Sequence, residues 1–351
     1  MNFSPAFKLA ACLVAIAVAG CAGNSTNAPG SSTSVMPQVR AGLKPPPPCI
    51  PKVWATSLSP SAVYGYTAPS SAPCVTLTGP YNGLNINAPI TVAIGAKPKR
   101  LYVTDLNNNR ILVFTYNGAF VKWWSTAYGG ALFQPWGVCV SNRGIVGVAN
   151  RQYNNTGPPG NVEFFSPSAP SGSQPSGEAN GVFIADQFCA FDKNGNFFVD
   201  GTTSSGQKIG YLARAFVNTP GQTLIDSGLG TASFWVGMYS RINNPVDDTL
   251  SVGTSTPSST TQIIMNWKVS GPAVGPLTFS ALSPYTLTSY PSTVNAMYQL
   301  APTPGGSTGK LFVADYGANQ VLGAPANGGS VALYNNLNST TGVATRPTGQ
   351  Y

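Results

Sequence analysis

The stretch PITVAIGAKPKRLYVTDLNNNRILVFTYNG, residues 89–118, contains three β-rich runs separated by turn residues. The runs are Pro89–Gly95, Arg100–Asp105 and Asn109–Phe114, and a fourth follows at Phe120–Trp124. Short runs of β-branched and aromatic residues bounded by Asn, Gly and Pro are typical of strands joined by tight turns. This unit therefore predicts a small antiparallel sheet of three or four strands.

The same pattern returns in KLFVADYGANQVLGAPANG, residues 310–328, and more weakly at 135–165, 188–212 and 234–267. The valines of the second runs mark the period, at Val103, Val148, Val199, Val252 and Val313. Their spacing drifts between 45 and 61 residues, which fits propeller blades with loops of variable length better than a rigid solenoid. The repeat predicts an all-β propeller.

Five blades are visible in the sequence, and a propeller ring must close because an open end leaves an unpaired strand edge. Residues 53–80 carry strand-like runs without a blade of their own, and residues 346–351 resemble the start of another unit. We predict a six-bladed β-propeller whose last blade combines both termini. Seven blades are the alternative.

The two clear units resemble the NHL repeat and, more loosely, gluconolactonase-type propellers. The residues that carry the resemblance are Leu101–Asp105 with Asn109 and Arg110, and Leu311–Asp315 with Asn319 and Gln320. The resemblance implies the fold and little about function, because such propellers host many functions.

Gluconolactonase-type propellers hold a divalent metal in the channel with Glu, Asp and Asn. This chain has two glutamates, Glu163 on an expected third strand and Glu178 in an expected loop. Since neither lies on an expected inner strand, we predict no metal site of that type and no cofactor.

The N-terminus reads MNFSPAFKLAACLVAIAVAGC, with an apolar run at residues 9–19 that is too short to span a membrane. Residues 18–21 resemble the bacterial lipobox. We therefore predict a lipoprotein signal peptide over 1–20 and lipidation at Cys21. An ordinary signal peptide with a chance cysteine is the alternative.

Residues 21–48 are rich in Ser, Thr, Gly and Pro, and we interpret them as a tether below a propeller domain at 49–351. Ala22 replaces the aspartate that typically retains such lipoproteins at the inner membrane. The expected location is a bacterial membrane, most readily the outer membrane, with the domain facing the periplasm or the cell surface.

The composition argues against most enzyme chemistries. The chain has no histidine, which removes Ser-His-Asp and Cys-His mechanisms and the usual zinc sites. Charged residues make up 8% of the chain, and its net charge of +8 comes from scarce acids rather than from basic tracts. The tightest basic cluster, at residues 97–100, is too short for a nucleic-acid surface.

The candidate binding residues are polar groups at strand ends and exposed aromatic side chains. The strand-end group is Asp105, Asn150 and Asp315, which could line one face or bond the backbone of the following turn. The aromatic group includes Trp136 and Trp235, with Trp123, Trp124, Tyr128 and Phe133 close in sequence to the first. These rings suit a sugar or peptide surface, or packing between blades.

Besides Cys21, four cysteines lie beyond the leader, at positions 49, 74, 139 and 189. An even count in an oxidising compartment predicts disulfides, and four cysteines allow three connectivities. We predict Cys49–Cys74 and Cys139–Cys189. Cys139 and Cys189 have opposite strand parity, as a bridge between adjacent blades requires. Cysteines packed as small apolar side chains are the alternative.

These observations favour a non-catalytic binding or scaffold module that recognises a protein, peptide or glycan through one propeller face. The second hypothesis is a metal-dependent hydrolase or lyase of the gluconolactonase type.

Overall fold

The chain divides into two units, Met1–Pro47 and Pro48–Tyr351. The computed structural model describes residues of the second unit, namely 49–67, 72–128, 131–151, 159–180, 185–192, 194–203, 206–212, 223–225, 238–240, 249–254, 261–271, 277–288, 297–302, 310–325, 329–330, 332–336 and 340–345. The predicted signal peptide, Cys21, the tether and Trp235 lie outside these residues.

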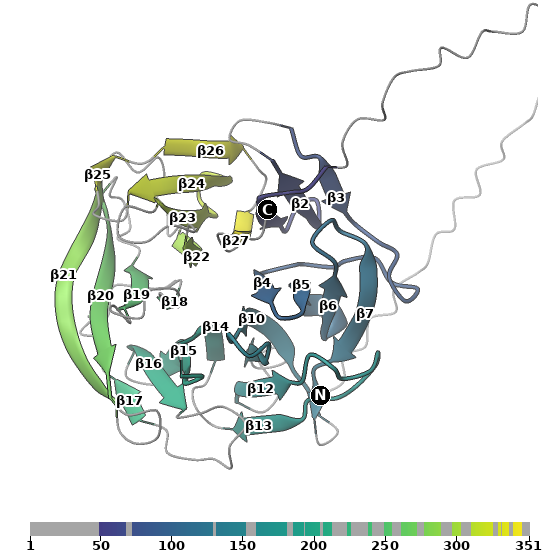
Figure 1. Cartoon of the computed structure of the whole chain (residues 1–351), viewed down its shortest axis with the longest axis horizontal. Coiled ribbons are helices and arrows are strands. Elements are labelled where there is room, and N and C mark those ends of the chain that lie inside the picture. Colours follow the sequence, from purple (N-terminus) through teal and green to yellow (C-terminus); the bar gives the residue numbers. More distant parts are fainter. Residues whose placement is uncertain are drawn as a thin grey trace, which may run out of the picture. The chain divides into compact units, whose positions relative to one another are not determined.

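The regular secondary structure of the described residues is strands apart from one 3₁₀ turn, and the strands form mainly antiparallel sheets around a centre (Figure 1). The β4–β7 sheet consists of β4 (Val92–Ala96), β5 (Lys99–Asp105), β6 (Arg110–Phe114) and β7 (Phe120–Ser125), with the 3₁₀ turn η1 (Leu106–Asn108). The β10–β13 sheet consists of β10 (Gln134–Val140), β11 (Val146–Arg151), β12 (Asn161–Phe165) and β13 (Gly177–Asn180). A ribbon of β8 (Ala127–Tyr128) and β9 (Ala131–Leu132) joins them.

The β14–β17 sheet consists of β14 (Ala185–Phe191), β15 (Phe197–Thr203), β16 (Gly206–Leu212) and β17 (Thr223–Ile225). The β18–β21 sheet consists of β18 (Met238–Ser240), β19 (Thr249–Thr254), β20 (Gln262–Ser270) and β21 (Thr278–Thr288), and also holds β25 (Gly329–Ser330). The β22–β26 sheet consists of β22 (Met297–Pro302), β23 (Lys310–Asp315), β24 (Gln320–Pro325) and β26 (Ala332–Asn336).

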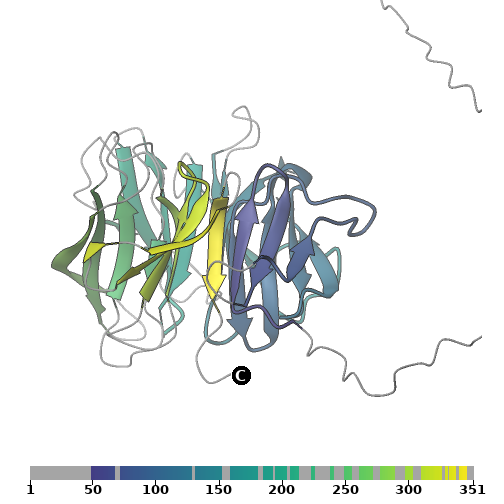
Figure 2. The same cartoon turned by 90° about the horizontal axis from the view of Figure 1, so that it is seen from above.

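Chain closure joins the two ends of the domain. In the closing sheet, β27 (Thr340–Thr345) pairs with β1 (Val53–Ser57), which is followed by β2 (Ala62–Tyr66) and β3 (Val75–Leu77). Figure 2 shows β27, in yellow, beside the purple N-terminal strands. The prediction of a sheet built from both termini is confirmed for residues 340–345, whereas residues 346–351 lie outside the described residues.

Among the described residues, five sheets are regular four-stranded blades, so the expectation of six such blades is wrong. The exception is the five-stranded β18–β21 sheet. Its strand β21 is 11 residues long, and its last two residues pair in parallel with β25. The length of β21 explains the departure, because an extended strand offers backbone groups to another partner.

Contacts between inner strands link each sheet to the next. They join β27 to β4, β4 to β10, β10 to β14, β14 to β18, β18 to β22, and β22 back to β27. The second-strand valines that set the sequence period are all fully buried. This is the arrangement of a β-propeller, in which facing sheets bury apolar side chains between them. The described residues include no helix long and apolar enough to cross a membrane.

Candidate functional site

Asp105 ends β5 and bonds to Arg110 of the next strand, to the turn that follows β5 and to the loop that precedes β4. Its side chain is fully buried and forms an ion pair with Arg110, with 2.6 Å between Arg110 Nε and Asp105 Oδ2. It also accepts hydrogen bonds from the Asn87 N–H at 2.8 Å and from Asn108 Nδ2. Burial raises its pKa, and these hydrogen bonds act in the opposite direction. The contacts match the structural interpretation of this residue.

Arg110 also fixes a hairpin that leads into this sheet. Its two terminal nitrogens donate to the carbonyl oxygens of Tyr81, at 2.7 Å, and Leu84, at 3.1 Å. Tyr81 and Leu84 pair with each other across Asn82 and Gly83, which both have positive φ. A two-residue turn with that geometry favours Asn-Gly. The buried guanidinium therefore holds the base of an exposed turn.

Asp315 occupies the corresponding place at the end of β23. It is fully buried and accepts hydrogen bonds from the Ala318 N–H at 3.1 Å and from Gln320 Nε2 at 3.2 Å. Asn319 has a positive φ of 58° in the turn, as Asn109 has one of 50°. Burial raises the pKa of Asp315 from 3.8 to about 6, against the effect of its hydrogen bonds. This carboxyl also serves the local turn.

Asn150 has the equivalent position on β11 but belongs to a different set of side chains. Asn150 Nδ2 donates to Asn161 Oδ1 at 2.8 Å, and Asn161 Nδ2 donates to Glu178 Oε1 at 2.8 Å and to Glu163 Oε1 at 3.4 Å. Glu163 and Glu178 are direct partners on β12 and β13. We call these four residues the glutamate–asparagine cluster. The expectation that Glu178 lies in a loop is wrong, because residues 177–180 pair with β12.

Glu163 is the most deeply buried acid of this cluster. Its side chain is fully buried, and burial, with the neighbouring Glu178 charge, raises its pKa well above the usual range. Hydrogen bonds from Asn150 and Asn161 act in the opposite direction. Sequence reasoning missed the cluster because 15 residues separate the two glutamates along the chain.

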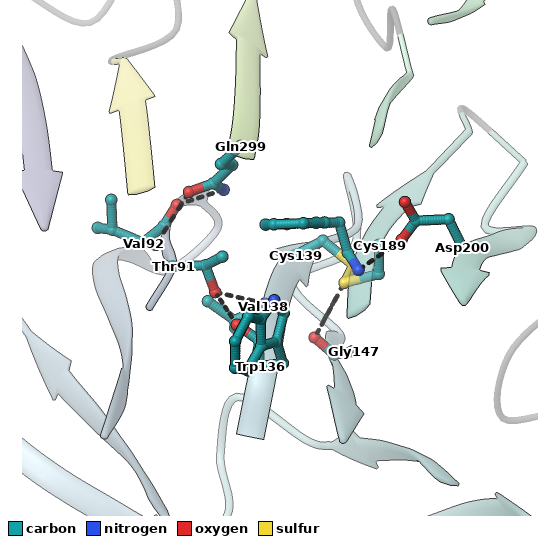
Figure 3. The surroundings of a disulfide bond; sticks show 10 residues. Thr91, Val92, Trp136, Val138, Cys139, Gly147, Cys189, Asp200 and Gln299 are labelled. Carbon is teal, nitrogen blue, oxygen red and sulfur yellow. Dashed lines mark hydrogen bonds between the residues drawn. A yellow bond between two sulfur atoms is a disulfide. The ribbon is translucent and has the colours of Figure 1, made fainter. Parts of the chain in front are cut away.

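Trp136 is 7% exposed and packs in an apolar cluster that spans several sheets. It sits in a bulge of β10, where Thr91 Oγ1 donates to the Trp136 carbonyl and accepts from the Val138 N–H (Figure 3). The guanidinium of Arg151 lies 4.2 Å from the Trp136 ring centroid. Trp136 is therefore an internal residue with a cation at one ring face.

The neighbouring aromatic residues pack between sheets. Trp124 is fully buried and stacks on Phe165 of the next sheet with ring centroids 5.1 Å apart. Phe133 is also buried. Their burial favours the interpretation that these rings pack between blades, and not that they form an exposed aromatic binding surface.

The four body cysteines form the two predicted pairs. Cys49 and Cys74 have Cα atoms 6.0 Å apart, and Cys139 and Cys189 have Cα atoms 5.8 Å apart. Figure 3 shows the second bridge between β10 and β14, beside the carbonyl of Gly147. Cys189 faces Val199 in register, as Val138 faces Val148, which confirms the predicted parity.

An exposed apolar patch lies over the fixed hairpin. Leu84 is 49% exposed and Phe120 is 37% exposed. The Tyr81 ring stacks on Phe120 with centroids 5.0 Å apart and also meets Phe114 edge-on. We call Tyr81, Leu84 and Phe120 the hairpin patch.

Among the described residues, no three His, Cys, Asp or Glu side chains gather in a group that could hold a metal. The glutamate–asparagine cluster contains two carboxylates, and its other members are amides.

Comparisons with known proteins show the fold alone. No known protein family and no curated protein matches the chain. A protein of unknown function from Bacteroides caccae is similar in structure, with a TM-score of 0.51, 11% identity, and coverage of 83% of this chain and 97% of that one.

A chain from a nidogen/laminin complex has a TM-score of 0.50 at 10% identity, covering 83% and 97% of the two chains. Kuenenia stuttgartiensis hydrazine synthase has a TM-score of 0.50 at 12% identity, covering 82% and 80%. Together with the closed set of sheets, these likenesses support a β-propeller, and at this identity they carry no function.

Proposed function

We propose that this chain is a lipid-anchored, non-catalytic binding or scaffold propeller that recognises a protein, peptide or glycan through one face. The proposal includes blades formed by NHL-like repeats. It also includes export, lipidation at Cys21, and display of the domain from a bacterial membrane.

The observation that carries the proposal is the hairpin patch on its buried support. Leu84 and Phe120 expose apolar surface, while the Asp105–Arg110 pair fixes the backbone beneath Tyr81 and Leu84. A rigid loop loses little conformational entropy when a partner binds. Exposed aromatic and aliphatic side chains on such a base suit recognition.

The gluconolactonase-type alternative has weaker support. Its metal ligands would line the channel, whereas Glu163 and Glu178 lie on the third and outermost strands of one sheet. Asp105 and Asp315 are engaged by their own turns.

Binding is tested with the purified protein on arrays of defined peptides and glycans. We expect binding to at least one probe, and a loss of at least tenfold in affinity in the double variant Leu84→Ala/Phe120→Ala. Leu282→Ala is the matched control, since Leu282 is 41% exposed on another sheet. Equal losses in both variants, or no binding to any probe, would contradict the proposal.

Anchoring is tested separately by mass spectrometry of the mature N-terminus. We expect an acylated cysteine at position 21, and Cys21→Ser should move the protein from the membrane to the soluble fraction. A mature N-terminus at another residue would show that the anchor is assigned incorrectly.

A further inference from the structure

Two buried oxygen atoms in the β10–β13 sheet have no hydrogen-bond partner among the described residues. They are Oδ1 of Asn150 and Oε2 of Glu163, and both side chains are fully buried. Buried polar atoms almost always have a partner, so an unsatisfied pair in one cluster indicates an ion, a proton or a water.

The two oxygens belong to adjacent strands, Asn150 on β11 and Glu163 on β12, and Glu178 lies on the next strand, β13. Asn150 faces Asn161 in register, and Glu163 faces Glu178. Asn150, Asn161 and Glu163 share the sheet face that carries Val148 and Phe165, which pack against the β4–β7 sheet. These three side chains therefore lie between the β10–β13 and β4–β7 sheets, whereas Glu178, on the outermost strand, is half-buried.

The equivalent strand ends show which charge is missing here. In the β4–β7 sheet, the register partner of Asp105 is Arg110, and the two form an ion pair. In the β10–β13 sheet the same two positions are Asn150 and Asn161. Two carboxylates lie next to this amide pair, without an ion-pair partner among the described residues.

We propose that the glutamate–asparagine cluster binds a Ca²⁺ ion, held by Glu163 Oε2, Asn150 Oδ1 and the Glu178 carboxylate. The cation supplies the positive charge that Arg110 supplies in the neighbouring sheet. Calcium prefers oxygen ligands of this mixed kind, carboxylates with amide carbonyls, and accepts flexible geometry. Glu178 is half-buried, so water can complete the coordination shell. Mg²⁺ demands a near-ideal octahedron, which side chains fixed on three adjacent strands do not favour.

The first experiment measures metal content and thermal stability of the purified protein. After treatment with a chelator and desalting, the protein is titrated with CaCl₂ or MgCl₂. We expect one Ca²⁺ per chain by elemental analysis, and a saturable rise in Tm of roughly 4 °C at a Ca²⁺ concentration of 100 Kd. MgCl₂ should produce less than half of that rise.

A second readout uses Tb³⁺ as a luminescent substitute for Ca²⁺. Trp124 stacks on Phe165, two residues along β12 from Glu163, so its excitation should sensitise bound Tb³⁺. Excess Ca²⁺ should remove the signal by displacement.

The variant Glu163→Gln keeps the shape of the side chain and removes its charge. We expect it to lose the Ca²⁺-dependent rise in Tm and the Tb³⁺ signal. Glu178→Gln should weaken Ca²⁺ binding at least tenfold. Asp315→Asn is the matched control, because it changes a buried acid at the equivalent strand end of another sheet, and its response to Ca²⁺ should equal that of the wild type.

The proposal fails if the wild type retains no stoichiometric Ca²⁺ and its Tm does not respond to added Ca²⁺. In that case a proton on Glu163 satisfies the two oxygens, and Glu163→Gln should have the wild-type Tm at neutral pH. Should Glu163→Gln not fold, the elemental analysis and the titration of the wild type still decide the question.

Discussion

At the scale of single residues, equivalent positions at strand ends perform one task with different chemistry. Asp105 pairs with Arg110, Asp315 pairs with Gln320, and Asn150 pairs with Asn161. Each pair joins the second strand of a sheet to the third. The local sequence predicts where each pair lies. The charge balance at each pair depends on the other polar side chains that are buried beside it.

Asp105→Asn should destabilise the protein strongly. The change leaves the Arg110 guanidinium buried without its counter-charge, and breaking a buried ion pair in this way costs about 3–5 kcal/mol. Chemical denaturation at pH 7 measures the loss. A change below about 1 kcal/mol would show that Arg110 finds another partner.

Asp315→Asn should change how the free energy of unfolding depends on pH. The folded-state pKa of Asp315 is about 6 against an ordinary 3.8, so the native state binds this proton more tightly than the unfolded chain does. The stabilisation is present at low pH and is lost as pH rises from about 4 to 6, by up to about 3 kcal/mol. The free energy of unfolding of wild type and variant, compared between pH 4 and pH 7, should diverge in favour of the variant. If the free energies of unfolding of wild type and variant changed with pH in parallel, the raised pKa of Asp315 would be contradicted.

At the scale of strands and sheets, bulges and close approaches set how neighbouring sheets meet. Thr91 bonds the bulge of β10, and Thr56 Oγ1 donates to the carbonyl of Ile90 in the next sheet. Gln299 of β22 accepts from the N–H groups of Val92 and Val343, on two other sheets. Polar side chains thus satisfy backbone groups that the strand ladders leave open.

Gly147→Ala should destabilise the contact between the β10–β13 and β14–β17 sheets. A Cβ at this position would lie 2.4 Å from a ring carbon of Phe197 and 3.0 Å from one of Phe191. Crowding of this kind typically costs about 1–3 kcal/mol. Thermal denaturation measures the effect.

Gly177→Ala is the matched control for this substitution. Gly177 also lies in a strand of the β10–β13 sheet, and its Cβ would meet only one atom, at 3.9 Å. Equal losses in the two variants would indicate that backbone entropy, rather than the Phe197 contact, determines the cost.

The Cys139–Cys189 bridge also acts at this scale, since it joins the inner strands of neighbouring sheets. Replacing both cysteines with Ser should lower stability by about 2–4 kcal/mol, because the unfolded chain regains the freedom of a long loop. Peptide mapping without reductant should show the bridged peptides in the wild type. Free thiols at both positions would exclude the bridge.

At the scale of the whole molecule, closure by both termini determines cooperativity. β27 is the inner strand of the closing sheet, and it also contacts β4 and β22 of the neighbouring sheets. Its removal exposes the edge of β1 and opens the ring at a central position.

Deletion of residues 340–351 should therefore lower Tm by far more than the loss of a free tail and should broaden the unfolding transition. Deletion of residues 346–351 alone is the control, because it leaves β27 intact. An unchanged Tm after the longer deletion would show that β27 does not hold the ring closed.

The sequence by itself determined the all-β class, the repeat and the closing sheet, and it predicted the two disulfide pairings among three possible connectivities. These follow from strand alternation, turn residues and chain order, which are local properties or direct consequences of a closed ring. The five second-strand valines that mark the sequence repeat are all fully buried, so the local repeat also predicted part of the core.

Only the tertiary structure brought Glu163 to Glu178, carried Gln299 to two other sheets, and gave β21 the fifth strand β25. The physical reason is that each contact depends on the register between segments distant in sequence or on the packing of one sheet against another. A local pattern of apolar and turn residues encodes neither that register nor that packing.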